Sequence, residues 1–117
     1  MDLTQAVSAH VAWKAKLRTA ISKKETMDIN TISADNCCEF GKWLHGEAKA
    51  KMSGLAAYKD TLSKHATFHK EAGKVATAIN ARKYPEAEAM LGAGTEYATA
   101  STAVSIAINN FKKEAGL

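Results

Sequence analysis

Histidine and cysteine are scarce in this sequence, and their spacing suggests metal chemistry. The chain has four His and two Cys. His65 and His69 are four positions apart, so on a helix both imidazoles lie on one face, about 6 Å apart at Cβ. Such a pair is able to chelate one metal ion. The alternative is that each is an ordinary core histidine held by hydrogen bonds, because a buried imidazole needs partners for its nitrogens.

One more histidine and a cysteine extend this pair to a full ligand set. His10 lies on the apolar face of an expected helix, and Cys38 stands at the start of another. Three imidazoles and one thiolate fill the tetrahedral coordination of Zn²⁺ and leave no position for water. A site of this kind is structural or regulatory rather than hydrolytic. An HExxH metalloprotease also needs Glu after its first His, where this chain has Ala66.

The elements that position these residues are expected to be helices. Alanine is abundant, Pro85 is the only proline, and no strand-like alternation is present. Short connections between long helices favour antiparallel neighbours. The sequence therefore predicts an all-α, antiparallel four-helix-bundle-like domain with one short helix that carries the cysteine. The expected helices span residues 3–24, 37–47, 54–80 and Pro85 to about Lys113.

Capping signals place the ends of these helices. Residues 25–36 are rich in Asp, Asn, Ser and Thr, which predicts a loop. Asp35 or Asn36 is expected to cap the short helix, and Gly46 to end it. Pro85 suits the first turn of the last helix, where its missing N–H costs nothing. His45 lies at the expected end of the short helix, which indicates a surface histidine rather than a ligand.

Length and charge limit the function classes. At 117 residues, the chain is expected to form a single domain over residues 1–117. Its formal net charge of +4 is small and the basic residues are dispersed, so no nucleic-acid partner is expected. No apolar run reaches ~18 residues, so no membrane contact is expected. Two adjacent cysteines cannot form a secreted disulfide framework, and no signal peptide is recognised, which indicates an intracellular protein.

Three short motifs together resemble a known family. In the chemoreceptor zinc-binding (CZB) domain family the pattern is H-x-x-W, then C-x-[hydrophobic]-G-x-W, then H-x-x-x-H. This chain has 27 residues between His10 and Cys38, and 26 between Cys38 and His65, which also fits. In the second motif, Phe40, Gly41 and Trp43 align with the family pattern when its cysteine is Cys38. Cys37 is then an additional thiol outside the motif. The late helix fits as well, so the resemblance extends over nearly the whole chain. The matching residues are His10, Trp13, Cys38, Phe40, Gly41, Trp43, His65 and His69.

This resemblance implies a function and partners. Members of the family are cytoplasmic bacterial sensor domains that commonly form homodimers and are attached to chemoreceptor signalling regions or diguanylate cyclases. They respond to zinc availability, or to oxidants such as hypochlorous acid that act on the zinc-bound cysteine. A regulatory Zn²⁺-binding domain, not an enzyme, is therefore expected. The alternative is a structural, zinc-stabilised helical dimerisation module. The implied ligands are His10, Cys38, His65 and His69.

Neighbouring residues are expected to support the site. Asp35, Glu39 and backbone carbonyls are candidate acceptors for the free N–H groups of the ligand imidazoles. Gly41 is expected to permit a close backbone contact near the metal. The aromatic residues flanking the ligands are expected to pack in the core, and these are Trp13, Phe40, Trp43 and Phe68.

Overall fold

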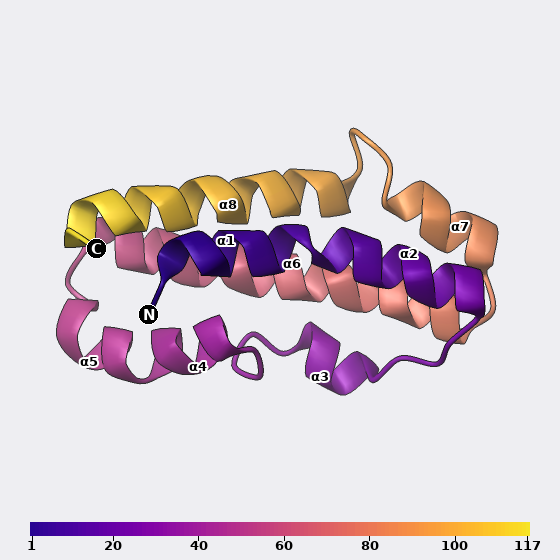
Figure 1. Ribbon diagram of the computed structural model, residues 1–117, viewed down its shortest axis with the longest axis horizontal. Helices are drawn as coiled ribbons and strands as arrows, with labels where there is room; N and C mark the ends of the chain where they lie inside the picture. The colour runs from indigo at the N-terminus through magenta and orange to yellow at the C-terminus, as the bar shows by residue number, and fades with distance from the viewer.

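The computed structural model describes residues 1–117, and its regular elements are all helices. They form four antiparallel columns, and the two chain ends lie at the same end of the bundle (Figure 1). The first column is α1 and α2, the second is α3, α4 and α5, the third is α6, and the fourth is α7 and α8. The predicted all-α, bundle-like fold is confirmed. The helices are α1 (Leu3–Val11), α2 (Trp13–Lys23), α3 (Ile29–Ser33), α4 (Glu39–His45), α5 (Glu47–Met52), α6 (Ala56–Asn80), α7 (Tyr84–Met90) and α8 (Glu96–Ala115).

The longest helix, α6, runs through the middle of the bundle. It packs against α8, α3, α7 and α2, while α1 packs against α8. Burial of its apolar side chains stabilises the bundle by about 1.5–3 kcal/mol for each large one. No helix is both long enough and apolar enough to cross a membrane. The core side chains of α6 include Phe68, Ala72, Val75, Ala76 and Ile79, and those of α8 include Tyr97, Val104, Ile108 and Phe111.

The first column closely follows the predicted helix over 3–24. Asp2 caps it, because its carboxylate accepts hydrogen bonds from the N–H groups of Thr4 and Gln5. The only interruption is at Ala12, whose φ of −65° and ψ of −19° remain helical. Lys24 ends α2 in the left-handed conformation, with φ 54°. The two helices therefore act as one rod.

The prediction of a loop over 25–36 is wrong in its middle, where α3 forms. The Asp28 side chain caps α3 by accepting from the N–H of Thr31. Ile32 is buried, so tertiary packing against α6 stabilises this short helix. The two helices α3 and α6 lie so close together that a Cβ added at Gly73 of α6 would collide with the side chain of Ser33. Polar composition alone did not reveal this packing.

The predicted short helix over 37–47 is also corrected. It begins later, as α4, and its cap is Cys38 rather than Asp35 or Asn36, since Cys38 Sγ lies 3.2 Å from the N–H nitrogen of Gly41 and accepts from it. Gly46 ends α4 as predicted. However, the chain continues directly into α5, so the second column is longer than expected.

The single helix predicted from Pro85 to about Lys113 is two helices. Pro85 lies in the first turn of α7, as expected. The helix is then interrupted between Met90 and Glu96. Gly94 in this segment adopts φ 79°, which glycine tolerates without strain. Thr95 caps α8 by accepting from the N–H of Ala98. The glycines that weaken this stretch therefore separate two helices.

Candidate metal centre

Four side chains from three elements converge inside the bundle. One possible ligand atom from each of His10, Cys38, His65 and His69 lies within 4.8 Å of all the others. His65 Nε2 is 3.0 Å from His69 Nε2, and Cys38 Sγ is 3.4 Å and 3.6 Å from these two nitrogens. A tetrahedron built from Zn–N of ~2.0 Å and Zn–S of ~2.3 Å has edges of ~3.3 Å and ~3.5 Å. The three separations among His65, His69 and Cys38 therefore suit one zinc ion.

Backbone carbonyls fix the orientation of two of the imidazoles. His10 Nδ1 donates to the carbonyl of Ala6 at 2.6 Å, and His69 Nδ1 donates to the carbonyl of Ile32 at 2.9 Å. A carbonyl only accepts, so Nδ1 carries the proton and Nε2 keeps its lone pair for the cluster. His10 Nε2 is buried and has no hydrogen-bond partner in the protein. A metal ion would satisfy this nitrogen, which is otherwise costly to bury.

Ile32 belongs to the candidate site although it was not predicted from the sequence. Its carbonyl orients His69, and it lies in the segment that was expected to be a loop. A local signal was present, because Asp28 stands three positions before Thr31 and apolar Ile29 and Ile32 lie on one side of a short helix. Of the expected kinds of acceptor, backbone carbonyls serve here rather than the side chains of Asp35 and Glu39.

Comparison with known families agrees with this geometry. The sequence pattern that defines the chemoreceptor zinc-binding domain matches residues 10–76. This span covers more than half of the chain and contains all four converging side chains. The chain belongs to the chemoreceptor zinc-binding domain family. It is thus a zinc-binding domain, and its donor set fits that metal. All of α7 and α8 lies beyond the match, so the resemblance of the late helix stays a prediction. No curated protein and no solved structure matches the chain significantly.

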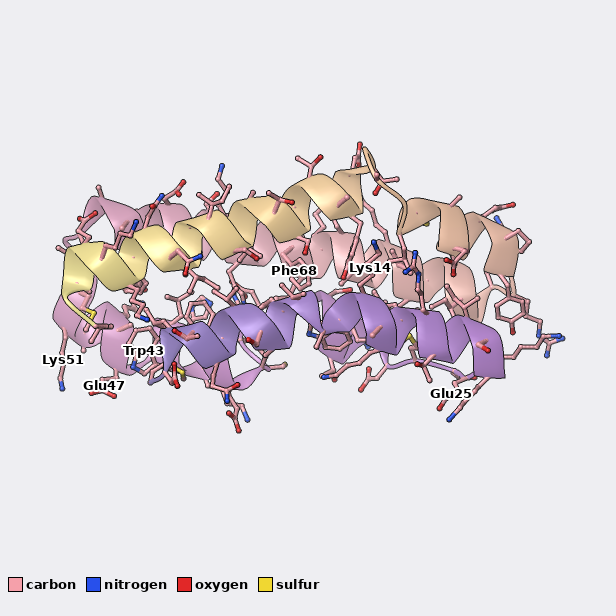
Figure 2. The ribbon with its side chains drawn as sticks, turned by 45° about the horizontal axis from the view of Figure 1, so that its top comes forward. Lys14, Glu25, Trp43, Glu47, Lys51 and Phe68 are labelled. Carbon is pink, nitrogen blue, oxygen red and sulfur yellow. The ribbon has the colours of Figure 1, made fainter.

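Aromatic rings enclose the donor cluster of this zinc-binding domain. The His10 ring meets Phe68 edge-on with 5.3 Å between centroids, and Phe40 meets the His65 ring at 5.1 Å. Phe68 lies in the middle of the bundle, between α1 and α8 (Figure 2). Phe40 and Phe68 are buried as predicted, whereas Trp13 and Trp43 are half-buried against the core. The rings help to bury the three histidines, whereas Cys38 stays partly exposed.

Burial keeps the imidazoles neutral in the metal-free protein. Burial, reinforced by the neighbouring His69 and His10, lowers the pKa of His65 to about 2. Burial also lowers the pKa of His10 and His69, although their hydrogen bonds to carbonyls oppose the shift. Burial raises the pKa of the Cys38 thiol, and the N–H of Gly41 opposes this. The histidines therefore present free lone pairs at neutral pH, while the thiolate needs a nearby cation.

These shifts predict that the metal-free domain loses stability in acid. The pKa of His65 is about 2 when folded and 6.5 in its reference state, so the unfolded chain binds more protons below pH 6.5. Stability therefore falls as pH falls. Between pH 7.5 and 5.5 we expect His65 alone to lower the free energy of unfolding by roughly 1 kcal/mol. Urea unfolding of wild type and His65→Gln at both pH values measures this. Equal pH dependence in the two proteins would contradict the expectation.

The remaining histidine and cysteine lie outside the cluster. Cys37 is exposed, and its Sγ is 3.6 Å from the side-chain oxygen of Asn36. His45 Nε2 is 3.0 Å from a carboxylate oxygen of Asp35, and both side chains are partly exposed. This pair joins the end of α4 to the segment before Cys38.

Gly41 allows the same segment to pack onto α4. A Cβ added at Gly41 would collide with the backbone carbonyl of Asp35. We expect Gly41→Ala to lower the free energy of unfolding by about 1–3 kcal/mol and to weaken zinc binding, because the backbone leading to Cys38 must move. Gly54→Ala is the matched control, since no atom lies within 4 Å of its added Cβ. Chemical denaturation of both variants tests this, and equal stability would refute it.

Proposed function

We propose that this zinc-binding domain is the regulatory sensor of a bacterial signalling protein. Its proposed zinc ligands are His10, Cys38, His65 and His69. One observation carries the proposal: Cys38 has two structural roles. Its Sγ lies 3.4 Å from His65 Nε2, and the same atom accepts the N–H of Gly41 as the cap of α4. A chemical change at this sulfur therefore acts on the ligand set and on a helix terminus together.

Each proposed ligand has a distinct part. Zn²⁺, when bound, holds Cys38 as a thiolate, the nucleophilic and oxidisable form. His65 and His69 provide two nitrogens from one face of α6, and His10 provides the third from α1. Because the four side chains fill a tetrahedron, no position is left for an activated water. This supports a regulatory role rather than hydrolysis.

Two kinds of stimulus act on this arrangement. With hypochlorous acid, the thiolate of Cys38 loses two electrons and gains the hydroxyl group as a sulfenic acid, while chlorine leaves as chloride. A sulfenic acid is a poorer ligand than a thiolate, so the start of α4 loses its anchor at the cluster. Falling zinc availability is the second stimulus. When the zinc ion leaves the site, the buried Nε2 of His10 has no partner.

The proposed output is a shift of the second column against α6. A local change in ligation biases helix packing, which an adjoining domain is able to detect. We propose a cytoplasmic homodimer that transmits the shift to a chemoreceptor signalling region or a diguanylate cyclase. The dispersed basic residues support a protein partner rather than nucleic acid. Neither a membrane contact nor an enzymatic activity forms part of the proposal.

A structural role is the second candidate. His65 and His69 are nearly fully buried, with 0% and 2% exposure. Such burial is expected for ligands of a metal ion that is never released. In that case zinc only stabilises a helical dimerisation module. The partial exposure of Cys38 favours the sensor instead, because a reagent is able to reach it.

Oxidation of the zinc-loaded protein separates the two functions. With hypochlorous acid near one equivalent, we expect altered zinc content and altered tryptophan fluorescence in wild type. Cys38→Ala should keep some zinc through three histidines and give no response, while Cys37→Ala should respond like wild type. A response that persists in Cys38→Ala and disappears in Cys37→Ala would show that Cys37, not Cys38, is the responding cysteine. A wild-type protein with unchanged zinc content and fluorescence would support the structural role.

A further inference from the structure

A surface groove of about 490 Å³ leads to the donor cluster from the side of α1. One wall is a stripe of residues on α1 and α2 that includes Gln5, Ala9 and Trp13, spaced four apart along one helix face. The other wall is the beginning of α4, with Cys38 and Glu39. The groove therefore lies between the two elements that hold His10 and Cys38.

The donors differ in their contact with this groove. Cys38 and His10 belong to its lining, whereas His65 and His69 do not. Cys38 is also the most exposed of the four, since the histidines are at most 3% exposed. In addition, Cys38 precedes a helix of only seven residues, while His65 and His69 are part of the 25-residue α6. Cys38 is thus the accessible donor, and it lies on the groove side.

We propose that zinc enters and leaves the site through this groove, with Ala9 setting its width and Glu39 favouring cations. The inference rests on the proposed ligand set. The charged side chains that line the groove are Asp2, Lys16 and Glu39, and Met1 lines it as well. Lys16 lies at the Trp13 end, with its Nζ 4.9 Å from the centre of the indole. Glu39 directly follows Cys38, and a carboxylate at this place attracts a divalent cation.

Ala9 is the position at which the groove is best closed. Its side chain is small and exposed, so a larger residue extends into the groove without entering the core. Ala9→Phe should obstruct the path between α1 and α4 and leave the four donors in place. Ala103→Phe is a matched control, because Ala103 lines a separate surface hollow on α8.

Zinc transfer to the chromogenic chelator 4-(2-pyridylazo)resorcinol tests the width of the route. For the zinc-loaded full chain we expect Ala9→Phe to slow transfer at least tenfold, and Ala103→Phe to match wild type. Both should carry one zinc per chain. If Ala9→Phe carries one zinc and transfers it at the wild-type rate, the groove is not the route. A wild-type chain that binds no zinc would instead overturn the proposed function.

A charge variant tests the same route without adding bulk. Glu39 is exposed and begins α4, so Glu39→Gln is expected to preserve the fold. In stopped-flow uptake of zinc by the metal-free chain, we expect a two- to tenfold slower rate at low salt, and a smaller difference at high salt, where charges are screened. Lys59→Gln on α6 is the control. A wild-type uptake rate for Glu39→Gln at low salt would overturn the role of Glu39.

Discussion

Replacing His65 with Ala is expected to lower the affinity for zinc at least ~1,000-fold, or about 4 kcal/mol. Structural zinc sites bind with about 10–16 kcal/mol through four ligands, so the loss of one ligand removes roughly a quarter of this. His65 is central to the cluster: its Nε2 lies 3.0 Å from His69 Nε2 and 3.4 Å from Cys38 Sγ. Competition with a chelator of known affinity measures the change.

His45→Ala is the matched control for this prediction. His45 is also a histidine on a helix near the site, but it is exposed and pairs with Asp35 outside the cluster. Its loss should change zinc affinity less than tenfold. Far-UV circular dichroism should confirm that both variants remain helical. Wild-type affinity in the helical His65→Ala variant would show that His65 is not a ligand.

Removal of zinc is expected to lower the free energy of unfolding by about 4 kcal/mol, relative to protein at a free zinc concentration 1,000 times its Kd. The proposed donors are brought together only when α1, α6 and the start of α4 pack against one another, so zinc binding there favours the folded chain. Without zinc, the buried Nε2 of His10 has no partner. Urea unfolding in buffered zinc and in chelator measures the difference.

The His65→Ala variant is the internal control for this second prediction. Its stability should be nearly the same in zinc and in chelator, because it binds the ion weakly. Equal stability of the wild-type protein under the two conditions would contradict the expectation. A zinc effect of the same size in His65→Ala would indicate a metal site elsewhere on the chain.

Features set by local periodicity were predictable from the sequence. The long apolar stripe around His65 and His69 predicted α6 to within two residues at its start, because helix periodicity persists over many turns. The same stripe placed both imidazoles on the buried face. His10 and Cys38 could be joined to them only through their spacing, since the distance between residues on different helices depends on tertiary packing. The structure brings all four together.

Features set by tertiary packing were not predictable. The five residues of α3 have little helical stability alone and depend on Ile32 packing against α6. Cys38 was not expected as a cap, because Asp35 and Asn36 are stronger capping residues. The carbonyl of Asp35 instead packs against Gly41, which moves the start of α4 toward the cluster. The cap sulfur therefore lies 3.4 Å from His65 Nε2.

X-ray absorption at the zinc edge of the zinc-loaded protein is the most direct test of the proposed ligand set. A site made by three histidines and Cys38 predicts one sulfur at ~2.3 Å and three nitrogens at ~2.0 Å around a single zinc per chain. In Cys38→Ala the sulfur contribution should vanish, and in Cys37→Ala it should persist. A spectrum of the wild-type protein with only nitrogen and oxygen neighbours would contradict the account.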